Sequence, residues 1–465
     1  MGDSRQHHVL IFPFMSKGHT IPILHLVHLL LRRQVAVTVI TTPANRPFIA
    51  QSLQDTSASI LQIPFPANLE GIPPGVESTD NLPSMSLFAR FALATQLMQP
   101  DFERSLESLP PIDFIVSDGF LWWTLESSIK YGFPRLVFNG MCNYSICVFR
   151  SVVQSGILFG NELDDELIPV PKFPWIKVTK NDFESHVKNP VGINGPDYEF
   201  VMKSMTASKS SYGYVVNSFY ELEPVFVDSF NNFVSGGPKA WCVGPLCLAK
   251  AHEKIEHQKP SWIQWLDEKT EQKSSVLFVA FGSQAKVLPD QLREISAGLE
   301  KSNVNFLWVT KEKESELGDG FEERVRGRGI VVREWVDQME ILKHPSVQGF
   351  VSHCGWNSVL EAISAGVPIL AWPMMAEQHL NARMVVEELE VGIRVETSNG
   401  SVRGFVKWEG LEKTARELME GEKGEEAKKK VMEYSTKAMQ AMGEKTGSSW
   451  RTLDMLIEEL CRKRT

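Results

Sequence analysis

The alternation of apolar runs with amphipathic stretches predicts repeated strand–helix units. Val9–Phe12 and Val35–Thr41 are short apolar runs, and Thr20–Arg32 between them carries apolar residues at helical spacing. The same plan returns in the apolar run Val276–Phe281 and the helical stretch Pro289–Leu299. Strands that alternate with helices build parallel sheets covered by helices. The pattern therefore predicts an α/β protein with two similar halves.

Further apolar runs and charged stretches extend both halves. More strands are expected at Ile112–Val116, Tyr214–Asn217, Ala240–Val243, Leu307–Thr310, Ile330–Val332, Val347–Ser352 and Ile369–Trp372. The polar segment Ala249–Pro260 has no apolar face and is typical of a linker. Mixed charge at helical spacing over Trp408–Gly443 indicates a solvated helical face, and Thr446–Arg462 is predicted to be a last amphipathic helix.

The segment from Met141 to about Asn217 breaks this regularity. It is rich in aromatic residues and proline and is predicted to be irregular. Two interpretations stay open, the wall of a hydrophobic pocket and ordinary core.

Composition narrows the class of protein. A chain of 465 residues is long enough for two domains, and a formal net charge of −9 argues against nucleic acid or an anionic membrane as the main partner. The six cysteines show neither a CxxC pair nor zinc spacing, which indicates free thiols in a reducing compartment. We find no leader peptide and no apolar run long enough to span a membrane. We therefore expect a cytoplasmic monomer.

A candidate anion site follows the strand Val347–Ser352. The next residues, HCGW, interrupt the apolar run, and Asn357 and Ser358 are good N-cap residues for the helix that follows. Gly366 is expected to end that helix. A strand-to-helix turn eased by Gly355 leaves backbone N–H groups directed at a ligand, and phosphate is the usual anion there.

Residues around this turn are suited to a nucleotide sugar. The carboxylate of Glu361 can accept hydrogen bonds from two ribose hydroxyls, and Trp335 offers a face on which a base can stack. Glu377 and Gln378 follow a strand and can bind the hydroxyls of a hexose. Taken singly, each of these residues is more often structural than functional.

His19 and Asp118 stand outside the carboxyl ends of two predicted strands. Alone, either residue is most simply a helix cap. If the two strand ends adjoin, the carboxylate can orient the imidazole as a general base. His25 and His28 lie deeper in the helix, and no second group of ligands accompanies the three histidines, so no metal is expected. Ser283, after another strand, could donate to a phosphate or simply form a turn.

The stretch from Trp335 to Gln378 resembles the signature of plant family-1 UDP-sugar glycosyltransferases. FPFMSKGH, VSDGF, WCVGPL and FGSQ extend the resemblance over nearly the whole chain. It implies the GT-B fold, in which two Rossmann-like parallel-sheet domains face each other across a cleft and the last helix returns to the N-terminal domain. The implied domains are 1–246 with 446–465 for the acceptor and 261–445 for the UDP-sugar, joined by a linker at 247–260.

The resemblance also implies residue roles. His19 would be the general base with Asp118 as its partner. Contacts to the donor would come from Ser283, Trp335, Val336, Gln338, His353, Gly355, Trp356, Asn357, Ser358, Glu361, Glu377 and Gln378. Contacts to the acceptor would include Phe14, Phe120, Met141 and Phe183. The family's small hydroxylic contact to the sugar is not assigned among Gly140, Met141 and Asn143.

The implied reaction is an inverting, metal-independent transfer of glucose from UDP-glucose to a hydroxyl of a small phenolic, flavonoid-like acceptor, without a cofactor. Attack from a phenolic ring carbon, which gives a C-glucoside, is the alternative within the same fold. A nicotinamide-dependent oxidoreductase would need a Gly-x-Gly-x-x-Gly turn, and the chain reads PFMSKGHT there. A non-catalytic nucleotide-sugar sensor would not need His19 and Asp118 together.

Overall fold

The structure, a computed structural model, describes residues 6–188, 195–232, 237–249 and 259–462. The chain divides into two compact units. The first contains residues 1–143, 189–251 and 440–465, and the second contains residues 144–188 and 252–439. Most of the linker predicted at 247–260 falls on residues 250–258, which lie outside the described residues.

The first unit is built on a parallel sheet of seven strands in the order β3-β2-β1-β4-β5-β8-β9. Every residue of β1 and of β4 is buried, which explains why their sequences read as continuous apolar runs. The sequence missed β3 and β5, which are bounded by polar or charged residues. The strands are β1 (His8–Phe12), β2 (Ala36–Thr41), β3 (Ser59–Gln62), β4 (Phe114–Asp118), β5 (Arg135–Asn139), β8 (Gly213–Val216) and β9 (Lys239–Cys242).

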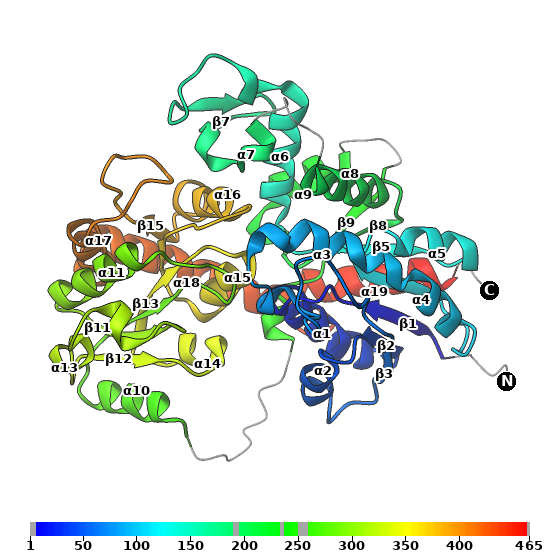
Figure 1. The fold of residues 1–465 in the computed structure, drawn as a ribbon, viewed down its shortest axis with the longest axis horizontal. Helices are drawn as coiled ribbons and strands as arrows, with labels where there is room; N and C mark the ends of the chain where they lie inside the picture. The colour runs from blue at the N-terminus through cyan, green and yellow to red at the C-terminus, as the bar shows by residue number, and fades with distance from the viewer. Residues whose placement is uncertain (1–5, 189–194, 233–236, 250–258, 463–465) are drawn as a thin grey trace. The chain divides into compact units, whose positions relative to one another are not determined.

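Helices cover both faces of this sheet (Figure 1). Val9 and Ile11 of β1 pack with α1 and α19 on one face, whereas Leu10 and Phe12 pack with α3 and α4 on the other. Alternate side chains of one strand thus serve two cores. The helices of the unit are α1 (Lys17–Leu31), α2 (Arg46–Ser52), α3 (Phe88–Ala94), α4 (Gln99–Leu106), α5 (Thr124–Tyr131), α8 (Pro196–Lys209), α9 (Pro224–Asn232) and α19 (Ser448–Arg462).

The last helix, α19, packs on the first unit, as expected. Arg33 donates from Nε to Asp454 at 2.5 Å and from Nη2 to the carbonyl of Trp450. Its guanidinium group also lies 3.8 Å from the centre of a Trp450 ring. This combination of an ion pair and a cation–π contact fixes α19 against α1.

The second unit repeats the plan with a parallel sheet of six strands in the order β12-β11-β10-β13-β14-β15. In both sheets the first three strands lie on one side of a switch point and the later strands on the other, as in doubly wound folds. The strands are β10 (Val276–Ala280), β11 (Asn305–Val309), β12 (Gly329–Val332), β13 (Val347–Ser352), β14 (Ile369–Ala371) and β15 (Gly392–Arg394).

Helices α11 and α17 cover one face of this sheet. Leu292 and Leu299 of α11 share a buried cluster with Leu411 and Leu418 of α17. The prediction of helix over Trp408–Gly443 is confirmed as two helices, α17 and α18. The helices of the unit are α6 (Asn143–Ser155), α7 (Ser185–Lys188), α10 (Ser261–Glu271), α11 (Pro289–Ser302), α12 (Glu314–Leu317), α13 (Phe321–Arg324), α14 (Gln338–Leu342), α15 (Trp356–Ala365), α16 (Gln378–Arg383), α17 (Trp408–Glu420) and α18 (Glu422–Ala441).

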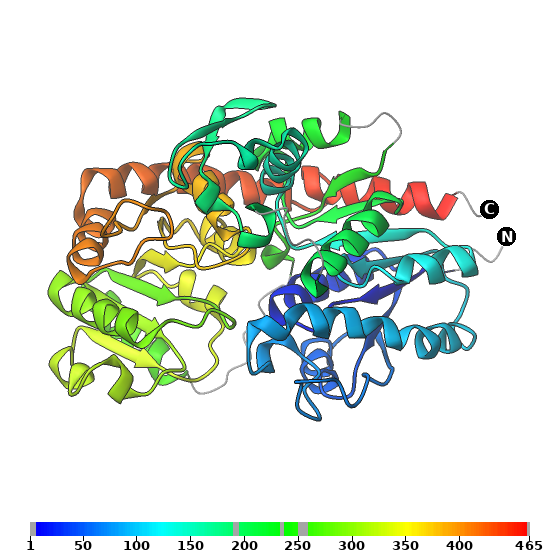
Figure 2. The same cartoon turned by 45° about the horizontal axis from the view of Figure 1, so that its top comes forward.

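The segment from Met141 to about Asn217, which the sequence predicted to be irregular, contains several helices and strands. It contains α6, the antiparallel hairpin of β6 (Ile168–Val170) and β7 (Phe173–Val178), and later α8. Residues 144–188 group with the second unit rather than with the first, where the sequence had placed them. Specific polar contacts hold them there, since Arg383 of α16 donates to Asp182 at 2.8 Å. Figure 2 shows the teal ribbon of this segment beside the gold ribbon of α16.

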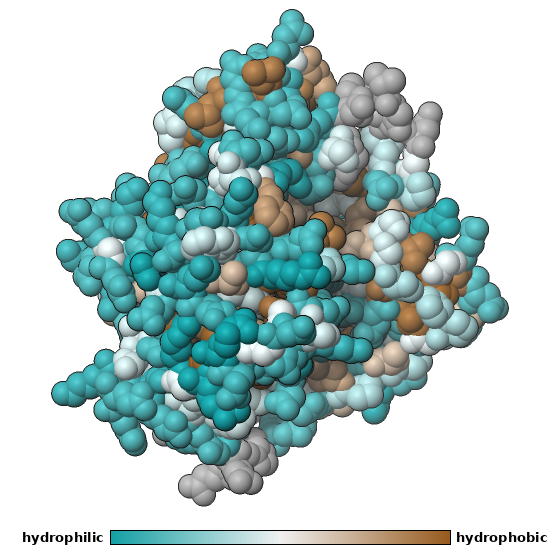
Figure 3. Space-filling view, turned by 60° about the vertical axis from the view of Figure 1, so that its left-hand side comes forward, coloured by the Kyte–Doolittle hydropathy of each residue, from teal (hydrophilic) through white to brown (hydrophobic). Residues whose placement is uncertain are grey.

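The face of the protein shown in Figure 3 is largely hydrophilic, with apolar residues scattered in small groups. Among the described residues, no helix is long and apolar enough to cross a membrane.

Candidate active site

His19 and Asp118 meet in the first unit. β1 and β4 pair in parallel, with Phe12 opposite Ser117, so their carboxyl ends lie side by side. His19 stands in the first turn of α1, which begins three residues earlier than the sequence predicted, and Asp118 ends β4. The Nδ1 atom of His19 lies 2.7 Å from Oδ2 of Asp118. The contact predicted from the two strand ends is therefore present.

This contact sets the tautomer of the imidazole. An ionised carboxylate only accepts hydrogen bonds, so Nδ1 carries the proton and donates a hydrogen bond to Asp118. The lone pair then resides on Nε2, the atom that a general base would use. The other carboxylate oxygen of Asp118 accepts from the backbone N–H of Phe120 at 2.9 Å, which fixes the orientation of the carboxyl group.

Arg135 supports this strand end from inside the core. Its guanidinium group donates to the side chains of Ser117, Thr124 and Ser211 and to the backbone carbonyl of Asp118. Burial lowers the pKa of Arg135 to about 10, and the charge of Asp118 opposes that change. Arg135 remains a cation at neutral pH and adds a fixed positive charge behind the carboxylate.

Aromatic rings surround the imidazole of His19. The ring centre of Phe120 lies 4.8 Å from that of His19, and the ring centre of Phe14 lies 5.7 Å away. Phe120 in turn packs edge to face on Phe88 and Phe200. Gly140 lies on another side, where an added Cβ atom would come within 3.7 Å of the imidazole. The base therefore stands in an apolar, aromatic environment.

In the second unit, the loops after β10 and β13 lie side by side because these strands pair in parallel, with Ala280 opposite Ser352. The imidazole of His353 lies between two glycines. A Cβ atom on Gly282 would stand 2.8 Å from its Nε2 atom, and one on Gly355 would stand 2.5 Å away. Gly282 also has a φ of 77°, which other residues rarely adopt. Only glycine fits at these two positions.

His353 is neutral in this setting. Burial lowers its pKa to about 4. Within the described residues, its buried Nδ1 atom has no hydrogen-bond partner. At neutral pH the ring can offer an N–H dipole to a phosphate but no positive charge.

One detail of the predicted anion site is wrong. The helix α15 begins at Trp356 with Gly355 as its N-cap, so Asn357 and Ser358 lie inside the first turn and do not cap it. The chain enters the helix earlier because Cys354 adopts a left-handed φ of 60° and turns the backbone sharply. Without a capping side chain, the first N–H groups of α15 remain directed outward at its N-terminus, which suits an anion.

A connected group of polar residues joins α14 to α15. The amide nitrogen of Gln338 donates to Ser358 at 2.9 Å and to Glu361 at 2.5 Å. Trp335, three residues before Gln338, is 65% exposed. The alternative that Trp335 is a core residue is thus excluded, and its indole face is accessible for stacking.

The carboxyl group of Glu361 is poised to titrate near neutrality. Burial raises its pKa to about 7, the hydrogen bond from Gln338 partly opposes this, and the charge of Asp337 adds to it. Both protonation states of Glu361 are therefore accessible near neutral pH.

The polar pair Glu377 and Gln378 follows β14, the next strand in the sheet. Glu377 is the N-cap residue of α16, and Gln378 opens that helix. The side-chain oxygen of Gln378 accepts from the backbone N–H groups of Met374 and Met375, both at 3.0 Å. A contact from Gln378 to a sugar would therefore use its amide nitrogen.

Burial distinguishes the remaining predicted residues. Ser283 is exposed and Val336, Asn357 and Met141 are partly exposed. The side chain of Trp356 is 2% exposed, so most of its ring faces core. Phe183 is 3% exposed and packs on Phe149, which favours the core interpretation at that position.

Some residues of the two sites escaped the sequence reasoning. Phe88 and Phe200 join the aromatic group beside His19 from helices α3 and α8. Asn381 donates to the carbonyl of Cys354 at 3.0 Å, and its own oxygen accepts from Ser145 at 2.7 Å. Asn381 and Ser145 thus hold the loop before α15 in place. No sequence spacing marks them, because each contact joins segments far apart in the chain.

Two doubly wound parallel sheets, with a last helix that packs on the first unit, are the architecture of the GT-B fold. The family model "UDP-glucoronosyl and UDP-glucosyl transferase" matches residues 254–436. The chain is 54% identical to UDP-glycosyltransferase 90A1 of Arabidopsis thaliana over 99% of this chain and 98% of that protein. It is 34% identical to UDP-glucose flavonoid 3-O-glucosyltransferase 7 of Fragaria ananassa over 98% and 96%.

Comparison with a solved structure supports the same family. The crystal structure of UGT73P12 of Glycyrrhiza uralensis with glycyrrhetinic acid 3-O-monoglucuronide superposes with a TM-score of 0.87 at 30% identity, covering 98% of this chain and 96% of that one. The chain belongs to the plant family-1 UDP-glycosyltransferases, enzymes that move a sugar from a UDP-sugar to a small acceptor.

Proposed function

We propose that this enzyme transfers glucose from UDP-glucose to a hydroxyl of a small phenolic acceptor, with inversion at the anomeric carbon. The observation that carries this proposal is the 2.7 Å contact between His19 and Asp118 within a group of aromatic rings. It combines a base in the correct tautomer with an apolar surface suited to a flat aromatic substrate.

In the proposed reaction, Nε2 of His19 takes the proton of the acceptor hydroxyl. The acceptor oxygen forms a bond to the anomeric carbon as the bond from that carbon to the diphosphate breaks, and UDP leaves. The resulting imidazolium is stabilised by the carboxylate of Asp118. A single displacement of this kind inverts the configuration at carbon.

We propose that the donor binds at the second unit. The uracil ring would stack on Trp335, with Val336 and Gln338 beside it, and the ribose hydroxyls would donate to Glu361. The diphosphate would lie at the N-terminus of α15, where backbone N–H groups, Ser283, His353, Asn357 and Ser358 supply donors. These groups offset the charge of the departing UDP, and we propose that neither a metal nor a cofactor takes part.

The sugar and the acceptor are the finer parts of the proposal. Glucose is favoured by the resemblance of Trp356, Glu377 and Gln378 to the glucose-preferring members of the family. A phenolic acceptor is supported by Phe14 and Phe120 beside the base and by the flavonoid substrate in the name of the Fragaria relative. The cysteine spacing, which contains no CxxC pair, supports the cytoplasm as the compartment.

The test is a panel of phenolic acceptors assayed with UDP-glucose, UDP-galactose and UDP-glucuronate and analysed by mass spectrometry. We expect glucosides, and we expect His19→Ala to lower kcat by ~10²–10⁴-fold on acceptors that are not already ionised. His25→Ala, on the same helix and also partly buried, serves as the control. Near-full activity of His19→Ala would exclude the assigned base.

Acid treatment of the same products distinguishes O-glucosylation from C-glucosylation. O-glucosides release glucose on treatment with acid, whereas aryl C-glucosides survive it. Acid-stable products would replace the proposed hydroxyl attack by attack from a ring carbon, with the same base.

A further inference from the structure

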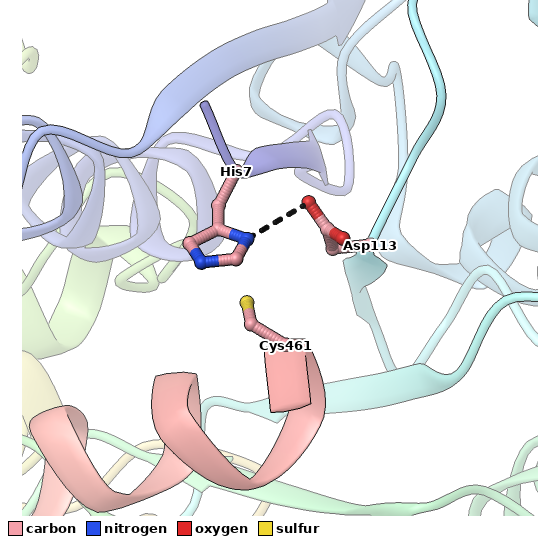
Figure 4. A group of neighbouring side chains, drawn as sticks. All are labelled: His7, Asp113 and Cys461. Atoms are coloured by element: carbon pink, nitrogen blue, oxygen red, sulfur yellow. Dashed lines mark ion pairs between the residues drawn. The ribbon is translucent and has the colours of Figure 1, made fainter. Parts of the chain in front are cut away.

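A second cluster of reactive side chains lies in the first unit, at the end of the sheet opposite the His19–Asp118 pair. His7 precedes β1, Asp113 precedes β4, and Cys461 stands in the last turn of α19. One nitrogen, one oxygen and one sulfur atom from these residues lie within 4.8 Å of one another (Figure 4). Asp118 ends β4 and Asp113 precedes it, so the two clusters are separated by the length of the strand, about 16 Å.

The carboxylate at the centre of this cluster is fixed in place. Oδ2 of Asp113 accepts from the backbone N–H of His8 at 2.7 Å, and the backbone N–H of Asp113 donates to the carbonyl of His8 at 2.9 Å. Nδ1 of His7 lies 3.6 Å from the same Oδ2 atom. Asp113 is therefore held rigidly between the starts of two strands, with the imidazole beside it.

Burial differs among the three residues in a way that suits a metal ion. Asp113 and Cys461 are buried, whereas the side chain of His7 is 45% exposed. The exposed imidazole leaves a route from solvent to the two buried donors. Its partly exposed ring has room to reorient, whereas its backbone carbonyl accepts from the N–H of Ala36 at 2.8 Å.

We propose that His7, Asp113 and Cys461 bind a zinc ion. Thiolate, imidazole and carboxylate are the donors that zinc selects, and tetrahedral coordination places such donors about 3.5 Å apart. Nδ1 of His7 and Oδ2 of Asp113 are 3.6 Å apart, and the three donor atoms lie within 4.8 Å of one another, so binding requires the donors to move closer together. A water molecule completes the fourth position on the exposed side.

Metal binding requires the thiolate form of Cys461 and the neutral form of His7. Cys461 loses its thiol proton to solvent as the sulfur binds the metal, and His7 binds in its neutral form. Metal affinity therefore rises with pH. The ion stabilises the fold by joining the chain start, the sheet and the last helix, which are distant in sequence. That distance is also why the cysteine spacing contained no zinc motif.

The test uses the full-length enzyme stripped with a chelator and titrated with Co²⁺, which replaces zinc and reports its ligands in the absorption spectrum. We expect one Co²⁺ per chain, with tetrahedral d–d bands and a thiolate-to-cobalt charge-transfer band in the near ultraviolet. Zinc should displace the cobalt and raise the Tm as its free concentration increases.

Three variants decide the assignment. His7→Ala and Cys461→Ser should weaken metal binding by ~10-fold or more, at least the effect known for residues that only support a ligand. Cys247→Ser, a partly exposed thiol of the same unit, should bind as the wild type does. Glycosyl transfer should be unchanged in His7→Ala.

The proposal fails if the wild type shows no thiolate band, if the band of His7→Ala forms at the same free Co²⁺ concentration as that of the wild type, or if Cys247→Ser abolishes the band. His7→Ala alters a partly exposed side chain outside the sheet, so it decides the question even if Cys461→Ser folds poorly. Activity plays no part in the metal readout, which keeps this test separate from that of the glycosyltransferase proposal.

Discussion

The Nδ1 atom of His19 lies 2.7 Å from Oδ2 of Asp118, although the two residues are 99 positions apart in the chain. Neighbouring parallel strands create this contact, since β1 leads into the helix of one residue and β4 ends at the other. The contact holds the imidazole in the tautomer that leaves Nε2 basic.

The first prediction concerns that tautomer. Asp118→Asn should lower kcat by ~10²-fold or more, because an amide nitrogen facing Nδ1 favours the tautomer with its proton on Nε2. The KM for the UDP-sugar should change little. Steady-state kinetics with an acceptor of high pKa measure both constants. Asp101→Asn, at a partly exposed acid of α4, is the control, and equal losses in both variants would contradict the assignment.

The second prediction concerns pH. Burial raises the pKa of Glu361 to about 7, and only the ionised carboxylate can accept from both ribose hydroxyls. UDP affinity should therefore rise as the pH increases through 7 and should level off at lower pH at the weaker affinity of the protonated form. Isothermal titration calorimetry with UDP measures this dependence.

Glu361→Gln is the matched variant for the pH experiment. It removes the titrating group, so its weaker UDP affinity should be nearly constant over the same pH range. A slope in Glu361→Gln equal to that of the wild type would assign the pH dependence to another group, such as the phosphate of UDP itself.

The third prediction concerns the glycines around His353. A Cβ atom at residue 355 would stand 2.5 Å from Nε2 of the imidazole, closer than side chains pack. Gly355→Ala should displace the ring and the loop before α15, and UDP affinity should fall by at least ~10-fold, a loss of about 1.4 kcal/mol. Gly18→Ala has open space for its Cβ atom and should bind UDP normally. Normal UDP binding by Gly355→Ala would show that the loop tolerates the shift.

The fourth prediction concerns the exposed indole of Trp335. Trp335→Ala should weaken UDP binding by ~5–150-fold, because base stacking on an aromatic side chain contributes about 1–3 kcal/mol. Its Tm should barely change, since exposed positions contribute little to folding. Trp335→Phe should recover part of the affinity.

Trp175 provides the control for Trp335. It is 55% exposed and belongs to β7 of the same unit, and its indole N–H contacts Glu388. Trp175→Ala should leave UDP affinity at the wild-type value. Similar losses in the two alanine variants would mean that removing an exposed indole disturbs the unit in a general way.

Much of the fold was predictable because parallel strands buried on both faces appear in the sequence as continuous apolar runs. Val347–Ser352 is apolar since both faces of β13 are covered, and its predicted bounds agree with the structure. Polar or charged boundary residues concealed other strands, such as Arg135–Asn139, whose arginine is buried in a hydrogen-bonded site. The residue types alone do not reveal that site.

The start of α15 shows a different limit of prediction from sequence. Asn357 and Ser358 are residue types that are common at helix N-caps, but the N-cap is Gly355 because Cys354 adopts a positive φ. Such a turn depends on tertiary contacts, here including the hydrogen bond from Asn381 to the carbonyl of Cys354. Local propensity could not locate it.

Local periodicity was enough to indicate two doubly wound halves and the candidate pair His19 and Asp118, and the resemblance to a known family marked the stretch from Trp335 to Gln378. Tertiary structure alone decided that Trp335 is exposed while Trp356 is buried, that His353 is neutral, and that residues 144–188 pack with the second unit. The reason is physical: strand and helix patterns follow from neighbours in sequence, whereas burial, pKa and side-chain contacts depend on segments that only folding brings together.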